Sequence, residues 1–130
     1  MDNSPNIILT GNAMSNQQLY KSMCRGRMSF MYMCPKGKNT KKRYISEILE
    51  QYKGKLHTEE LGLEVIFFFG TRHKRDCDNY SKLVLDAMEG IVYEDDKLVK
   101  PLLINKFYDK ENPRIEIRFV KDYKANYEKQ

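Results

Sequence analysis

One segment of the chain carries acidic and basic residues at a spacing that suits metal-assisted hydrolysis of a phosphodiester. Asp76 and Asp78 are two positions apart, Lys82 follows the second of them, and Asp95 and Asp96 come about a helix length later. Mg²⁺ prefers hard oxygen ligands, and a few convergent carboxylates can hold it. One or two such ions activate a water and stabilise the leaving oxygen of a phosphate ester. The pattern therefore indicates phosphoryl chemistry at a metal.

A lysine and a basic run accompany these acids. Lys82 lies one turn into the helix expected after Asp78, where a cation can hold a phosphate oxygen or stabilise transition-state charge. The run from Arg72 to Arg75 offsets the repulsion that carboxylates alone would exert on DNA. Each feature also has a structural explanation: a DxD is most often a helix cap beside a solvated acid, and a DD after a glycine is most often part of a turn. Their conjunction favours the catalytic interpretation.

A buried strand and a helix must position the acids. The segment Leu61 to Gly70 is apolar on both faces and is typical of a central strand. Asp78 is expected to cap a helix that runs to about Glu89, ended by Gly90. Further strands are expected from Leu98 to Phe107 and from Arg114 to Val120. If the first of these pairs beside the central strand, the second acidic pair returns near the first.

The N-terminal half adds two strands and a helix. Ile7 to Thr10 and Ser29 to Met33 are predicted strands, and CPKGKN after the second is predicted to be a turn. Thr40 is expected to cap a helix through about Tyr52, which puts Lys41 to Arg43 in its first turn. Because the helix dipole disfavours cations there, we interpret these charges as serving a ligand. The order β–β–α–β–α–β–β indicates an α+β fold, a mixed sheet with two main helices packed on it.

Length and charge fit a domain that binds nucleic acid. The chain has 130 residues, and we expect residues 1–130 to form a single domain with one core. Between Lys21 and Lys55, ten lysines and arginines accompany two glutamates, a net charge of +8 where the whole chain has +5. This distribution suits a surface for polyanions beside a separate acidic centre. A lysine-rich solvated face is the plain alternative.

The cysteines and the N-terminal stretch bear on the cellular compartment in which the protein is expected. Cys24, Cys34 and Cys77 are odd in number and lack CxxC spacing, which fits reduced thiols in a cytosol-like setting and gives no zinc site. The N-terminal stretch has only a short apolar run, so neither a secretion signal nor a membrane span is expected.

The stretch RDCDNYSKLVLDAMEGIVYEDDKLV resembles the signature of the RusA family of Holliday-junction resolvases. That signature has an arginine-rich lead-in, then D-x-D-N-x-x-K, a helix with a DAL-like triplet, a glycine and a DD. Here these elements are Arg75, Asp76, Asp78, Asn79, Lys82, Asp86-Ala87-Met88, Gly90 and Asp95-Asp96. SNQQLY, from Ser15 to Tyr20, is similar to the family's N-terminal loop, although the proline pair common there is missing.

The resemblance implies an activity and a set of site residues. Family members are small homodimers that bind four-way DNA junctions and cut two opposed strands with Mg²⁺ or Mn²⁺. They act in the bacterial cytosol, and phages or prophages frequently encode them. By the resemblance, the metal ligands are Asp76, Asp78 and Asp96, and Lys82 is the further catalytic residue. We expect DNA contacts from Arg72, Lys74, Arg75, Arg25, Arg27, Lys41, Lys42, Arg43 and Asn16.

Two other functions stay open at this point. A non-catalytic nucleic-acid-binding module with a degenerate acidic cluster would also carry the basic surface, but the retained Asp, Asp, Lys and Asp set argues against it. A different two-metal phosphoryl-transfer enzyme, such as a nucleotide hydrolase, would need a nucleobase pocket, and no motif suggests one. A cleavage assay with Mg²⁺ separates the first of these from a nuclease.

Overall fold

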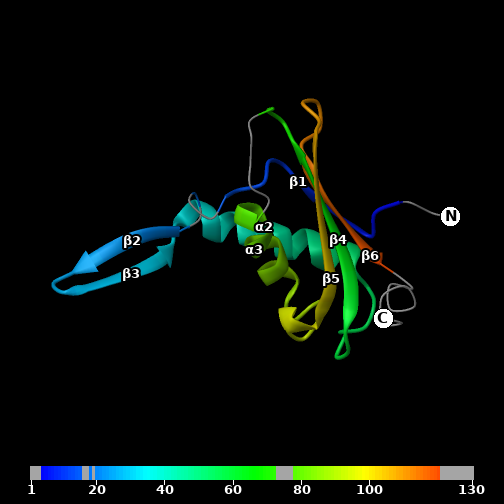
Figure 1. Cartoon of the computed structure of the whole chain (residues 1–130), viewed down its shortest axis with the longest axis horizontal. Coiled ribbons are helices and arrows are strands. Elements are labelled where there is room, and N and C mark those ends of the chain that lie inside the picture. The colour runs from blue at the N-terminus through cyan, green and yellow to red at the C-terminus, as the bar shows by residue number, and fades with distance from the viewer. Residues whose placement is uncertain (1–3, 16–17, 19, 73–77, 121–130) are drawn as a thin grey trace, which may run out of the picture.

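Two helices lie against one face of a four-stranded sheet, and a two-stranded hairpin extends away from them (Figure 1). The arrangement is that of a computed structural model. It describes residues 4–15, 18, 20–72 and 78–120, apart from the side chains of residues 20–25, 29–31, 78 and 79. The expected α+β class, with a mixed sheet and two main helices, is confirmed. Within the described ranges, no helix is long and apolar enough to cross a membrane.

The main sheet contains β1 (Ile7–Thr10), β4 (Leu61–Phe69), β5 (Val99–Tyr108) and β6 (Arg114–Val120). Their order is β1–β6–β4–β5. β4 pairs in parallel with β5 and antiparallel with β6, and β6 pairs antiparallel with β1. All four strands were predicted to within a residue at each end, because their β-branched and aromatic residues favour a pleated strand.

The core lies between this sheet and the helices α2 (Pro35–Gln51) and α3 (Asp78–Met88). The side chains that fill it are all buried: Ile7, Leu9, Leu63, Val65, Phe67, Ile115 and Ile117 from the sheet, and Tyr44, Ile48, Leu83, Val84, Ala87 and Met88 from the helices. Burying each large apolar side chain contributes about 1.5–3 kcal/mol to stability. This packing anchors α3 on the sheet and so places the helix relative to the strands.

α2 begins well before Thr40, so the predicted start of this helix was wrong. CPKGKN is its beginning rather than a turn, because a proline is preorganised for the first helical position and needs no N–H partner there. Thr40 lies inside the helix, and its hydroxyl donates to the Lys36 carbonyl oxygen at 2.9 Å. The first turn therefore holds Lys36 and Lys38, whereas Lys41 to Arg43 lie beyond it. The dipole argument for those three cations no longer holds.

The separate hairpin consists of β2 (Tyr20–Arg25) and β3 (Met28–Met33). β3 was predicted, but β2 was missed, because YKSMCR has little of the β-branched and apolar alternation that predicts a strand. The residue that could have revealed this strand is Gly26, which has a φ of 60° and joins β2 to β3 in a two-residue turn. Tight hairpin turns require a positive φ at their first central residue.

Side chains of α2 occupy the outer edge of β1. Gln51 accepts the Ile8 N–H and donates to the Ile8 carbonyl oxygen, both at 2.7 Å. Glu47 accepts the Thr10 N–H at 3.2 Å, and Arg43 donates to the Thr10 carbonyl oxygen at 3.0 Å. Their spacing of four residues puts the three side chains on one helix face. This face closes one edge of the sheet, and β5 forms the other edge.

Candidate active site

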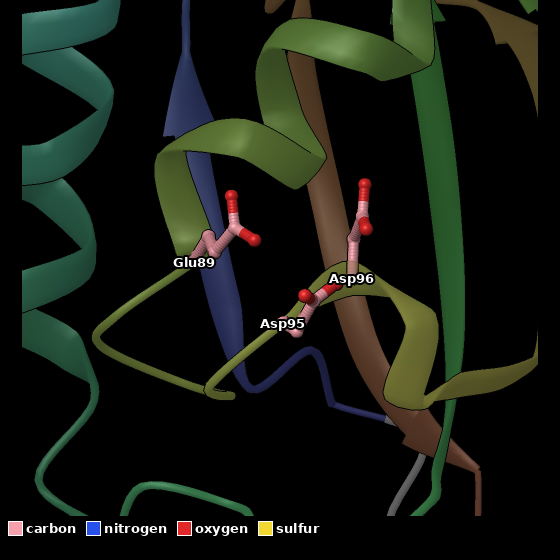
Figure 2. Close-up of side chains that lie close together, drawn as sticks. All are labelled: Glu89, Asp95 and Asp96. Carbon is pink, nitrogen blue, oxygen red and sulfur yellow. The ribbon is translucent and has the colours of Figure 1, made fainter.

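Glu89, Asp95 and Asp96 form an acidic cluster beside the C-terminal end of α3. Figure 2 shows Glu89 coming from the end of that helix and the two aspartates from the turn before β5. One carboxylate oxygen from each lies within 4.8 Å of the others. Two oxygens that bind one Mg²⁺ at about 2.1 Å are at most about 4.2 Å apart, so a small closing of this cluster brings its carboxylates to the spacing of a shared ion. The described side chains of this cluster can therefore accept a hard divalent cation.

A tight turn brings the two aspartates back to Glu89. Gly90 has a φ of 86°, a conformation that residues with side chains rarely adopt. Its N–H donates to the Tyr93 carbonyl oxygen at 2.7 Å. The Tyr93 side chain is fully buried, and its hydroxyl donates to the Leu85 carbonyl oxygen at 2.5 Å. The predicted helix end at Gly90 is thus confirmed, and Tyr93 is the buried anchor of the turn.

The two aspartates have different surroundings. Asp95 caps the 3₁₀ helix η1 (Asp96–Leu98), because its carboxylate accepts the Lys97 N–H at 2.9 Å. That bond, and a second to the Asp96 side chain, lower the pKa of Asp95. The hydrogen bond to Asp95 raises the pKa of Asp96, and burial and the negative charges of Asp95 and Asp86 add to this effect. A bound cation would relieve this repulsion.

Asp96, which was predicted as a metal ligand, lies in this cluster. Glu89 also belongs to the cluster, but it was not predicted as a ligand. Glu89 follows Lys82 by seven positions, which puts both on one face of α3. That spacing was the signal available in the sequence. Lys82 is exposed and lies one turn from the start of the helix. Asp76 and the side chain of Asp78 lie outside the described residues.

α3 places the backbone of Asp78 and the acidic cluster at opposite ends of the helix within one copy of the chain. Its eleven residues rise about 1.5 Å each, which puts the backbones of Asp78 and Met88 about 15 Å apart. The predicted pairing of β5 with β4 is confirmed, but it is parallel. The start of β5 therefore lies beside the start of β4, whereas α3 follows the end of β4. Asp95 and Asp96 thus return beside Glu89 at the C-terminal end of α3, and the expected meeting with Asp76 and the Asp78 carboxylate stays a prediction, because these lie outside the described residues.

The residues predicted to bind DNA occupy several places. The guanidinium carbon of Arg72 lies 4.3 Å from the centroid of the Tyr108 ring. Arg27 is exposed at the hairpin turn, and Lys42 is exposed on α2 with Lys41 half-buried beside it. Arg43 contacts β1 and lies 3.7 Å from a Glu47 oxygen. Outside the described residues lie Asn16, Lys74, Arg75 and the side chain of Arg25.

The family model described as Endodeoxyribonuclease RusA matches residues 11–119. The chain belongs to the RusA family. It is 31% identical over 117 residues to the crossover junction endodeoxyribonuclease RusA of Aquifex aeolicus (strain VF5), which covers 81% of this chain and 93% of that protein. It is also 48% identical over 44 residues to the uncharacterized protein YqaN of Bacillus subtilis (strain 168), or 34% of this chain and 30% of YqaN. The RusA match includes both helices and the acidic cluster. The resemblance is confirmed, and the chain is an endodeoxyribonuclease by family.

Proposed function

We propose that this RusA-family endodeoxyribonuclease resolves four-way DNA junctions by paired nicks, as a homodimer that uses a divalent metal. The observation that carries the proposal is the acidic cluster of Glu89, Asp95 and Asp96 within the region that matches the family. The name of the Aquifex relative, a crossover junction endodeoxyribonuclease, supports the choice of substrate. The proposed setting is the bacterial cytosol, and the coding source a phage or prophage.

Mg²⁺ is the proposed ion, with Mn²⁺ as a substitute. Every donor in the cluster is a carboxylate oxygen, the ligand type that hard cations prefer. When bound, the ion would supply an activated water and charge stabilisation for the leaving oxygen. We propose Asp96 as a ligand from this cluster, supported by Glu89, together with Asp76 and Asp78 from the signature.

The length of α3 limits which residues of one chain can reach the same metal ion. The backbones of Asp78 and Met88, at the two ends of the helix, lie about 15 Å apart along its axis, and Asp96 belongs to the cluster at the second end, whereas a ligand oxygen lies about 2 Å from Mg²⁺. In a twofold dimer whose α3 helices run antiparallel, the start of one helix lies beside the end of the other. We therefore propose that each metal site takes Asp76 and Asp78 from one copy and Asp96 from its partner.

Cationic residues complete the proposed site. Lys82, exposed on the α3 face that leads from Asp78 to Glu89, stabilises the charge that develops on the phosphate. Phosphates beside the cut are held by Arg72, Lys74 and Arg75. The junction arms contact Arg25, Arg27, Lys41, Lys42 and Asn16, with Arg43 at the margin because its guanidinium also binds β1.

The test is incubation of the purified chain with a synthetic four-way junction, a fork and a linear duplex. Each DNA is offered with Mg²⁺, with Mn²⁺ and with a chelator, and Asp96→Asn serves as the matched inactive control. Paired nicks at the junction with either metal, and none with the chelator, are expected. Binding without cutting under every condition would favour the non-catalytic module, and equal cutting of the linear duplex would contradict junction selectivity.

A further inference from the structure

Arg72 and Tyr108 meet at the end of the sheet from which the chain leaves for α3. Tyr108 is the last residue of β5 and pairs with Phe69, the last residue of β4. Arg72 follows Phe69 by three positions, and its guanidinium lies over the Tyr108 ring, 4.3 Å from the centroid. The face of an aromatic ring attracts a cation. The ring therefore holds the guanidinium beside the edge strand.

This contact leaves both side chains open to a ligand. Tyr108 is 40% exposed, and Arg72 is exposed as well. A guanidinium carries five N–H donors, and its attraction to a ring face does not use them as a carboxylate partner would. Among the described residues, Arg72 makes no ion pair with a carboxylate. Its charge and its donors remain available to an anion.

Arg114, another arginine that lies over an aromatic ring at this end of the sheet, shows the contrast. Its guanidinium lies 3.8 Å from the centroid of the Phe68 ring. Its donors also bind carboxylate oxygens of Asp109 and Glu116, both at 2.8 Å. Arg114 thus has its anions within the fold. Arg72 has the same kind of aromatic support without such partners in the described part of the chain, which points to an anion from outside.

We propose that Tyr108 is a positioning residue that holds Arg72 in place for a DNA phosphate beside the cut, an inference that rests on the junction-cutting function proposed above. Arg72 precedes Asp76 by four positions, so the chain tethers it to the proposed metal ligands. A guanidinium that is already ordered by a ring loses less side-chain entropy when it binds. Tyr108 acts on the phosphate only through Arg72.

The experiment compares junction binding by the wild type, Tyr108→Ala, Tyr108→Phe, Arg72→Ala and the Tyr108→Ala/Arg72→Ala double variant. Affinities are measured over a series of salt concentrations without divalent metal, and thermal unfolding reports on folding. Phe107→Ala is the matched control, since Phe107 is a neighbouring aromatic residue of β5 that is 58% exposed and stacks on Phe68 instead of an arginine.

We expect Tyr108→Ala to weaken binding roughly two- to tenfold and to reduce the slope of log affinity against log salt by up to about one. Tyr108→Phe should bind like the wild type because the ring remains, and Phe107→Ala should also be unchanged. The double variant should bind no worse than Arg72→Ala alone, because Tyr108 has no separate contact with DNA.

Three results would overturn the inference: unchanged affinity and slope in Tyr108→Ala, a loss in Tyr108→Phe as large as in Tyr108→Ala, or additive losses in the double variant. If Tyr108→Ala unfolds, Tyr108→Leu takes its place, because leucine keeps an apolar side chain on the strand but offers no aromatic face to the guanidinium. A wild type that neither binds nor cuts the junction contradicts the proposed function as well. If the wild type cuts the junction normally and the Tyr108 variants bind the junction as tightly as the wild type, only the proposed role of Tyr108 is contradicted.

Discussion

Asp95 and Asp96 are consecutive in the chain, yet their pKa values are displaced in opposite directions. The Lys97 N–H, 2.9 Å from an Asp95 oxygen, lowers the pKa of Asp95. The pKa of Asp96 is raised because its side chain is hydrogen-bonded to that of Asp95, and also by burial and nearby negative charge. Asp96 is therefore the member of the pair that holds a proton to higher pH.

We predict that divalent-metal affinity rises with pH above roughly pH 4, the ordinary range for an aspartate. Below its folded-state pKa, Asp96 is protonated and cannot bind the ion, whereas above it the carboxylate is free to do so. Asp95→Asn removes the charge that helps to raise the pKa of Asp96 and should move this rise to lower pH. Calorimetric titration with Mn²⁺ at several pH values measures the midpoint, and an unmoved midpoint would show that Asp95 does not control Asp96.

The same displacement affects stability with a definite sign. Since the folded state binds the Asp96 proton more tightly than the unfolded chain does, the Asp96 contribution is stabilising at low pH and is lost as pH rises through its folded-state pKa. Asp95, with its lowered pKa, contributes in the opposite sense, and its stabilisation is lost as pH falls.

We predict that Asp76→Asn, Asp78→Asn and Asp96→Asn each reduce cleavage by roughly a hundredfold or more, because a metal contributes several kcal/mol to transition-state stabilisation. Junction binding should be retained or tighter, since each change removes a negative charge. Gel assays of binding and cutting on one labelled junction measure both. Glu50→Gln, an exposed acid of α2, is the control. An inactive Asp95→Asn beside an active Asp96→Asn would mean that Asp95 is the ligand.

Mixed dimers test the division of the site between two copies. Coexpressed Asp78→Asn and Asp96→Asn chains should regain cutting, as single nicks, because one of the two sites then receives both intact groups. A mixture of Asp76→Asn with Asp78→Asn should stay inactive, since both changes affect the same end of α3. Recovery in neither mixture would indicate that each site lies within one chain.

For Lys82→Ala we predict a loss of turnover of roughly a hundredfold with less than a threefold change in junction affinity, because one cation near the developing charge acts mainly in the transition state. Single-turnover cleavage and equilibrium binding separate the two quantities. Lys110→Ala, an exposed lysine in the turn before β6, is the control. If junction affinity and turnover fell equally, Lys82 would be an ordinary phosphate contact and not a residue that acts in the transition state.

Gln51→Ala should destabilise the fold by about 1–2 kcal/mol, because the Ile8 N–H and carbonyl lose their two hydrogen bonds. Alanine is a better helix former than glutamine, so the helix itself is not weakened. Urea unfolding measures the change in free energy. Glu50→Ala, at the neighbouring exposed position, should stay within about 0.5 kcal/mol of the wild type, and an equal loss there would rule out the edge contact as the cause.

The sequence predicted what depends on local patterns and missed what depends on the packed structure. β4 and β6 follow from apolar alternation, and the end of α3 follows from Gly90. The start of α2 was missed because proline and glycine were taken for a turn although proline also suits a first helical turn. Glu89 was missed because its neighbours come from a turn that Tyr93 anchors. The parallel pairing of β5 with β4 was missed because the periodicity of apolar residues within one strand does not show in which direction its neighbour runs.

The contact between α2 and β1 has a consequence for sequence variation. Apart from the Thr10 hydroxyl, which donates to Glu47, these hydrogen bonds reach only backbone atoms of the strand. Exchanges at Ile8 should therefore leave the link intact. One residue inserted in α2 between Arg43 and Gln51 would rotate the later side chains by about 100° and detach them from the strand. Homologous chains can thus vary at Ile8, but α2 must keep its helical phase relative to the strand.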